Sequence, residues 1–301
     1  MEESRLGVPA ERRVSVANLA HPLPATWALV AVFGVLTFVT YTRVPPEQLY
    51  NVSREGIAGG ASRTLVYLNF PVAFVAIGVL LVCLERLRER RLRVLGLVGI
   101  ALCAVAAWPG VLDQDDLDAR PINALPAAGV AVAAALTVLY MRDPSWTWAR
   151  PAGRLRVVVA VAAGLMSVPW LFAEAGFYAP DPILSDEVPA GEHEVAVHLG
   201  GHHGTYGVIM VLSALALSRL ARRSITSIVL ALLFAYGGTI AAEDFWHEQI
   251  QKRGTSDWTF PSALSPGLDW VWLGIVLAAA AIELLWFRRE RRATPRAPAP
   301  R

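Results

Sequence analysis

Residues 64–84 read TLVYLNFPVAFVAIGVLLVCL, a stretch of 21 residues without a charged side chain. The next nine residues, 85–93, read ERLRERRLR and carry five arginines. An apolar stretch of about 20 residues is long enough to cross the roughly 30 Å hydrocarbon core of a bilayer as a helix. A basic run directly after such a stretch is typical of the cytoplasmic end of a membrane span. Together they predict a helix that crosses a membrane and ends in the cytoplasm.

Similar apolar stretches recur along the whole chain. Of its 301 residues, 55% are hydrophobic and 17% are charged, and the apolar residues stand in blocks rather than at amphipathic spacing. This composition excludes an ordinary soluble fold. We predict an all-α integral membrane protein with about eight transmembrane helices, at residues 26–43, 64–84, 94–109, 122–141, 157–177, 199–218, 225–247 and 268–287.

The basic residues predict the orientation of these spans. Of the 27 lysines and arginines, 21 fall before the first span, after the last, or in alternate connections between them. The other side carries 6 basic and 17 of the 25 acidic residues, so the formal charges of the two sides are +13 and −11. The positive-inside rule then predicts that both termini are cytoplasmic. Insertion and anionic lipid account for the basic side, so we expect no nucleic-acid partner.

The sequence predicts three regions. Residues 1–25 form a cytoplasmic N-terminal segment, residues 26–287 form a single transmembrane helical domain, and residues 288–301 form a basic cytoplasmic tail that we expect to be disordered. The first apolar block is too long for a signal-peptide core, so we interpret it as an uncleaved span. No connection is long enough for an independent domain.

Histidines and carboxylates are concentrated at one predicted end of the helices. Five of the six histidines lie within residues 193–247. The fifth span ends at Glu174, the sixth begins near His198, and the seventh ends at Glu243 to His247, all on the predicted outer side. Ionisable groups at membrane depth are costly, so their recurrence favours a cavity, a proton path or a metal site.

The spacing of these residues suggests a metal site. His198 and His202 are four residues apart, as are Glu243 and His247, so each pair can share one helix face. Helical bundles build zinc and di-iron centres from such pairs. We therefore predict that His198, His202, Glu243 and His247 bind a divalent metal, with zinc favoured over iron. Glu174 and Asp244 are the candidate catalytic carboxylates.

The residues around the histidines add two expectations. His203 points about 100° away from His202 on an ideal helix, so only one of the two is expected to bind the metal together with His198. Four glycines in residues 200–207 favour a close approach between helices. The alternative interpretation is that these polar residues only lie in the headgroup layer.

Local resemblances extend over a few residues only. His198-xxx-His202-His203 resembles one histidine box of membrane fatty-acid desaturases and hydroxylases, and also the HxxxH of alkaline-ceramidase-like hydrolases. The acidic run Asp113, Asp115, Asp116 and Asp118 is similar to the aspartate-rich sequences of prenyl-chain enzymes, with a solvated loop or a calcium or magnesium site as alternatives. No functional residue follows from these resemblances.

Three classes of function agree with this pattern. The first is a metal-dependent hydrolase or transferase, or a di-iron oxidase, that acts at the outer leaflet on a lipid, an isoprenoid or another amphipathic substrate. The second is the outer vestibule of a cation or proton-coupled transporter or channel. The third is a non-catalytic membrane assembly factor. Because the inner halves of the sixth and seventh spans are almost entirely apolar, the sequence favours a one-sided site, and with it the first class.

Overall fold

The structure is a computed structural model, which describes residues 21–49, 51–113, 116–142, 148–175, 201–251, 254–264 and 266–293. Within these ranges the protein is all-helical and has no β-strand, in agreement with the predicted fold class. The α-helices are α2 (Pro22–Arg43), α3 (Gly56–Tyr67), α4 (Ala73–Leu84), α5 (Arg90–Ala104), α6 (Ala124–Tyr140), α7 (Arg154–Met166), α8 (Val168–Glu174), α9 (Gly201–Leu217), α10 (Ser224–Trp246), α11 (Trp270–Ile282) and α12 (Arg288–Ala293). Short 3₁₀ turns lie at Pro46–Gln48 (η1), Val105–Ala107 (η3) and Pro121–Asn123 (η4), and π turns at Leu68–Val72 (η2), His247–Gln251 (η7) and Glu283–Phe287 (η8).

Five helical segments are long and apolar enough to cross a membrane: Pro22–Arg43, Gly56–Leu84, Pro121–Tyr140, Ser224–Trp246 and Trp270–Ala293. Helices also cover the other three predicted spans, but each of these is shorter. They are α5 with its 3₁₀ turn, the broken pair α7 and α8, and α9. The protein is therefore a helical bundle with the composition of a membrane protein.

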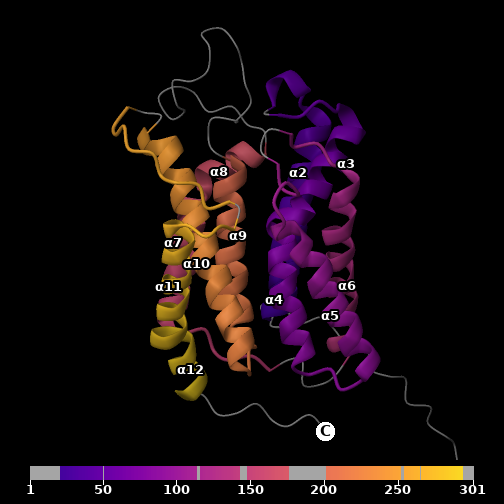
Figure 1. Cartoon of the computed structure of the whole chain (residues 1–301), viewed down its shortest axis with the longest axis vertical. Helices are drawn as coiled ribbons and strands as arrows, with labels where there is room; N and C mark the ends of the chain where they lie inside the picture. Colours follow the sequence, from indigo (N-terminus) through magenta and orange to yellow (C-terminus); the bar gives the residue numbers. More distant parts are fainter. Residues whose placement is uncertain are drawn as a thin grey trace, which may run out of the picture.

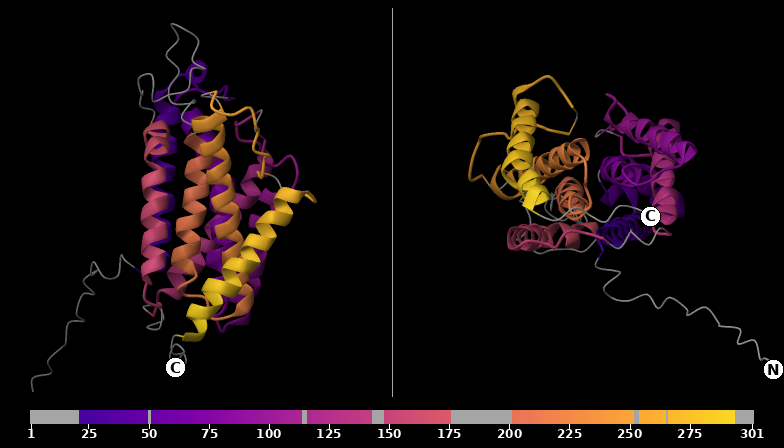
Figure 2. Two further views of the ribbon diagram at one scale, coloured as in Figure 1. Left: turned by 90° about the vertical axis from the view of Figure 1, so that its left-hand side faces the viewer. Right: turned by 90° about the horizontal axis from the view of Figure 1, so that it is seen from below.

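The helices run nearly parallel to one another along the long axis (Figure 1). Helices α2 to α6 form one group and α9 to α12 another, with α11 and α12 inclined to the rest (Figure 2). The main pairs are α9 with α10, α2 with α3, and α5 with α6, while α2 and α4 both contact α9 and so join the groups. Sequential helices thus pack as antiparallel neighbours, which is the usual result of short connections.

Apolar side chains fill the interior and also cover the outside. Val79, Leu80 and Met210 are fully buried between helices. Val35, Val158 and Leu277 are more than half exposed on the outer faces of their helices. A helix that is apolar on all sides needs an apolar surrounding, so these outward faces are the ones that lipid would cover.

The second span is interrupted where Pro71 removes a backbone donor, at the π turn η2. The amide nitrogen of Asn69 donates to the carbonyl oxygens of Leu65 and Asn123, at 2.8 and 2.9 Å. The Asn123 amide donates in turn to Asn69 Oδ1 at 2.9 Å. Asn69 therefore joins the second span to the start of the fourth by hydrogen bonds.

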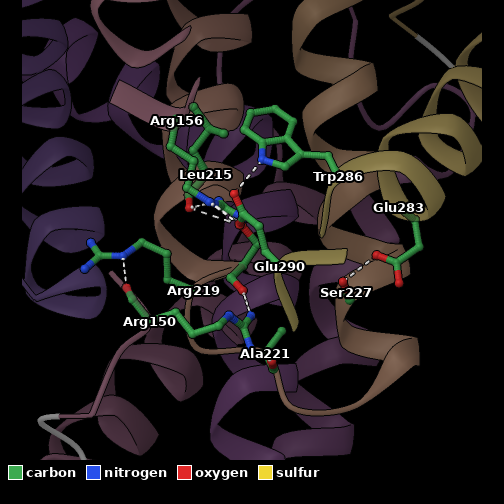
Figure 3. A network of polar contacts seen from close by, with 10 residues as sticks. Arg150, Arg156, Leu215, Arg219, Ala221, Ser227, Glu283, Trp286 and Glu290 are labelled. Atoms are coloured by element: carbon green, nitrogen blue, oxygen red, sulfur yellow. Dashed lines mark hydrogen bonds and ion pairs between the residues drawn. The ribbon is translucent and has the colours of Figure 1, made fainter. Parts of the chain in front are cut away.

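Arginines join the helices at the end of the bundle that carries the basic connections. We call this the arginine-rich end and define it by Arg86, Arg150, Arg156, Arg219 and Arg222. Figure 3 shows Arg156, 3% exposed, with its Nε and Nη2 on Glu290 Oε2 at 2.7 and 2.6 Å. Its Nη1 donates to the Leu215 carbonyl at 2.7 Å, which ties α7 to α9 and α12.

Arg150, in the connection before α7, forms hydrogen bonds with the segment between α9 and α10 at the same end. Its guanidinium donates to the carbonyl oxygens of Ser218 and Ala221, and its own carbonyl accepts from Arg219 Nε at 2.6 Å (Figure 3). Burial, together with the charges of Arg156 and Arg291, lowers the pKa of Arg150 to about 10. The side chain therefore stays protonated at neutral pH, and its backbone acceptors offset the cost of burying it.

Candidate functional site

The described candidate site residues lie at the opposite end of the bundle. We call it the acidic end and define it by Glu174, Glu243 and Asp244, which are all buried there. Glu174 ends α8, whereas Glu243 and Asp244 lie in the last turn of α10. Glu174 and Glu243 belong to two separate clusters, each with its own partners.

Glu174 belongs to a cluster of buried polar residues from α2, α3, α8 and α9. It is 1% exposed, and its Oε1 accepts a hydrogen bond from Thr37 Oγ1 at 2.5 Å. Its backbone carbonyl accepts from Thr40 Oγ1 at 2.6 Å. Two hydroxyls, one turn apart on α2, thus hold the end of α8 and orient the carboxylate.

Arg63 of α3 is the cation of this cluster and is 3% exposed. Its Nη2 donates to the Tyr206 hydroxyl at 3.0 Å. Its guanidinium carbon lies 5.4 Å from the centre of the Tyr41 ring and 5.8 Å from that of Tyr206. The two tyrosines are the main electrostatic partners of Arg63, and the carboxylate of Glu174 adds a weaker attraction, so a cation and an anion lie in one buried cluster.

Arg63 was not among the predicted site residues, because it directly precedes the span predicted at residues 64–84. The apolar block begins at Thr64, but α3 begins at Gly56, so Arg63 lies well inside a helix. Added Cβ atoms at Gly59 and Gly60 would lie 2.9 Å from the Tyr41 carbonyl and 2.6 Å from that of Phe38. The pair Gly59-Gly60 followed by an arginine is the sequence signal that could have revealed this closely packed extension.

Below this cluster, toward the arginine-rich end, the described interior is mainly apolar. One turn after Tyr206 comes Met210 and one turn later Ala214, and both are fully buried. Val75 and Leu233 face the same interior from α4 and α10 and are at most 5% exposed. Ser213 is the one hydroxyl of α9 at this depth. The cluster is therefore polar toward the acidic end and closed by hydrocarbon on its other side.

Glu243 and His247 form the second cluster, with the segment 254–264. Glu243 Oε2 accepts from the Ala263 amide at 3.0 Å, and His247 Nε2 lies 3.1 Å from the Phe260 carbonyl, to which it donates when that nitrogen carries the proton. Trp246 Nε1 donates to the Trp258 carbonyl at 2.8 Å. The predicted i,i+4 pair thus shares one face of α10 and its π turn, and that face holds the connection before α11.

The predicted metal site is only partly described by the structure. His198 lies outside the described residues, and of His202 only the backbone is described, in the first turn of α9. Among the described residues, no group of three His, Cys, Asp or Glu side chains is placed to hold a metal ion. The convergence of His198, His202, Glu243 and His247 remains a prediction, and so does the role of Asp244.

The glycine-rich start of α9 packs as the sequence predicts. An added Cβ at Gly204 would lie 2.2 Å from the Trp170 ring, and one at Gly207 would lie 2.5 Å from the Gly237 carbonyl. The close approach of α8 and α10 to α9 is therefore confirmed at these two positions. Because Gly207 meets α10, His203, one turn earlier, lies on the α10 side of α9, whereas position 202 lies on the side of Tyr206.

The acidic run has a structural role at Asp118. Its Oδ2 accepts from the Ser53 amide at 3.1 Å and from the Ser53 hydroxyl at 2.5 Å, and Ser62 Oγ lies 3.3 Å from Oδ1. Asp113 pairs with Arg120 at 3.3 Å. These contacts join the connection after α5 to the start of α3. They favour the loop interpretation over cation capture for Asp118.

Comparisons with family models, with curated proteins and with solved structures found no match to this chain.

Proposed function

We propose that this protein crosses the membrane with eight spans, has both termini in the cytoplasm, and acts at the outer face through a site at the acidic end. The five long apolar helices and the three shorter helices over the remaining predicted spans support this number. The division of basic residues between the two ends supports the orientation.

For the activity, we propose an enzyme that hydrolyses, or transfers a group from, a lipid or another amphipathic substrate of the outer leaflet. The main support for this proposal is that Arg63 and Glu174 are both buried at one end of an otherwise apolar bundle. A charged side chain in the bilayer costs about 2.5–3.5 kcal/mol on insertion scales, so intramembrane ionisable pairs mark functional sites. The apolar interior beneath them argues for a one-sided site rather than a transport path.

The groups of this cluster suit acid–base chemistry. Glu174, oriented by Thr37, would accept a proton from water or from a substrate hydroxyl. Arg63 and the Tyr206 hydroxyl would stabilise the negative charge that develops on an ester or phosphoester. A carboxylate base beside such donors is the usual requirement of acyl and phosphoryl transfer.

Comparing substrate turnover by wild type and Glu174→Gln tests this activity. Each purified protein would be incubated with liposomes made from the total lipid of the source organism, and the lipids compared by mass spectrometry. We expect a lipid that is consumed by wild type and by the exposed control Glu47→Gln, but not by Glu174→Gln. Identical lipid profiles for wild type and Glu174→Gln would contradict the enzyme.

We also propose that a divalent metal, zinc rather than iron, binds where the histidines gather. The favouring observation is the contact of His247 Nε2 with the Phe260 carbonyl. Metal-binding histidines commonly donate one ring nitrogen to such an acceptor and bind the metal with the other. The ligands would be His247 and Glu243 from α10, with His198 and His202 from the start of α9. When bound, the metal would supply an activated water.

Metal analysis of the gently purified protein separates the two proposals. One equivalent of zinc in wild type, lost in His202→Ala and in His247→Ala, is the expected result. Because His203 lies on the α10 side of α9, His203→Ala tests which of the two histidines contributes. Absence of metal from active wild type would reject the metal and leave the Glu174 chemistry in place.

A further inference from the structure

A groove on the lipid-facing side of the arginine-rich end is the strongest feature outside the acidic end. It lies between α4, α5 and α10 and has a volume of about 190 Å³. Its lining residues are Leu81, Leu84, Glu85, Arg93, Leu97, Arg223, Ile225 and Thr226.

The polar and apolar lining residues are separated along the membrane normal. Leu97 is one turn after Arg93 on α5, and Leu81 is one turn before Glu85 on α4. In both helices the apolar residue is therefore the one closer to the middle of the bundle. The groove thus has a charged mouth at the level of the headgroups and an apolar floor at the level of acyl chains.

The mouth carries a net positive charge. Arg93 and Arg223 are exposed, and within the described part of the chain neither guanidinium has a hydrogen-bonding or ion-pair partner. The one acid, Glu85, is already engaged, because its two oxygens accept from the backbone amides of Arg222 and Arg223 at 2.6 and 2.9 Å. Glu85 thus binds the two backbone amides just before α10, and the two arginine side chains are left to bind an external anion.

We propose that this groove binds a phospholipid with a net anionic headgroup, in the leaflet that faces the arginine-rich end. The phosphate would lie between Arg93 and Arg223, with no cationic group in the headgroup to repel them, and an acyl chain would lie against Leu97 and Ile225. Basic pockets between helices on the cytoplasmic side are the usual sites for such headgroups, and each arginine near the surface contributes about fivefold in affinity.

Native mass spectrometry of the full chain tests this site. Phosphatidylglycerol and phosphatidylcholine with identical acyl chains would be added in competition to protein released from detergent. We expect wild type to prefer phosphatidylglycerol about tenfold, and Arg93→Gln/Arg223→Gln to lose that preference. The matched control is Arg91→Gln, an exposed arginine about 200° around α5 from Arg93, which should keep it.

A second variant, Leu97→Trp, fills the apolar floor without changing the charge. It should weaken the binding of both lipids while the unfolding temperature stays that of wild type. No preference in wild type, or a preference retained by the double arginine variant, would overturn the proposal. An equal loss in Arg91→Gln would also overturn it, because the preference would then come from general surface charge.

Discussion

At the level of single residues, Arg63 and Glu174 are two opposite charges buried in one cluster, and burying a charge is costly. Each side chain is at least 97% buried and hydrogen-bonds to a hydroxyl group, and a weaker electrostatic attraction acts between the two charges. Removing one member of such a pair leaves the other charge buried without compensation, which typically costs about 3–5 kcal/mol. Replacing both with neutral groups avoids that penalty.

This reasoning predicts a non-additive effect on stability. Arg63→Met and Glu174→Gln should each destabilise the folded protein by several kcal/mol, and the double variant by clearly less than their sum, with a coupling of at least about 1 kcal/mol. The free energy of unfolding of wild type, the two single variants and the double variant would be measured in detergent with a chemical denaturant. The exposed Arg54→Met serves as control and should change stability by no more than about 0.5 kcal/mol. Additive single effects would mean that the two charges do not interact.

The sequence identified only part of this cluster. Glu174 was predicted because it ends an apolar block at the same side as the histidines. Arg63 was not, because a charge next to an apolar block usually lies in solvent, and only the tertiary contacts with Tyr41 and Tyr206 make its burial possible. Glu243 and His247 do share a face, as their spacing predicts. That spacing does not distinguish a metal site from the structural role seen here, in which both side chains contact the segment 254–264.

At the scale of helices, close packing of α9 against α10 depends on glycines. Gly207 and Gly237 face each other so closely that an added Cβ on either would lie 2.5 or 2.6 Å from the other's carbonyl oxygen. Gly238, next in the same helix, has nothing within 4 Å of an added Cβ. A side chain would therefore clash with α9 at position 237 but not at position 238.

Alanine substitutions at these two positions of α10 should accordingly change the stability of the protein in different directions. Gly237→Ala should destabilise the protein by about 1–3 kcal/mol, because the helices must separate. Gly238→Ala should be neutral or stabilise it by up to about 1 kcal/mol, since alanine favours the helix. Thermal unfolding of both variants in the same detergent provides the comparison. Equal destabilisation would show that helix contact is not what selects glycine at position 237.

The helices were largely predictable because apolar block length carries most of the information about a membrane helix. Their ends were less so. Helix α2 begins at Pro22 rather than near residue 26, because proline is favoured in the first helical turn and the His21 side chain accepts from the Leu23 amide. Helix α3 begins eight residues before the apolar block, where glycines rather than hydrophobic residues make the contacts.

At the scale of the whole molecule, the charged residues divide between two ends. Among the described buried charges, Arg86, Arg150 and Arg156 lie at one end and Glu174, Glu243 and Asp244 at the other, with Arg63 and Glu283 as exceptions. The orientation proposed above, with the acidic end outside, rests on this division and on the positive-inside rule.

Cysteine labelling in intact cells tests the orientation. Cys83 and Cys103 are fully buried, so the native thiols should give little background. Asp257→Cys, in the exposed segment at the acidic end, should react with a membrane-impermeant maleimide, whereas Arg90→Cys should react only after permeabilisation. The reverse pattern would mean that the protein has the opposite orientation in the membrane and that the proposed site faces the cytoplasm.

We propose that the site around Glu174 is reached only from the outer face, and carbodiimide labelling tests this access. Intact cells and inverted vesicles would be treated with a water-soluble carbodiimide and a nucleophile, and the Glu174 peptide measured by mass spectrometry. Exposed Glu47 at the acidic end and Glu89 at the arginine-rich end report access from each side. We expect modification of Glu174 together with Glu47 in intact cells and not in inverted vesicles. Modification together with Glu89 from the arginine-rich end, or from neither side, would contradict it.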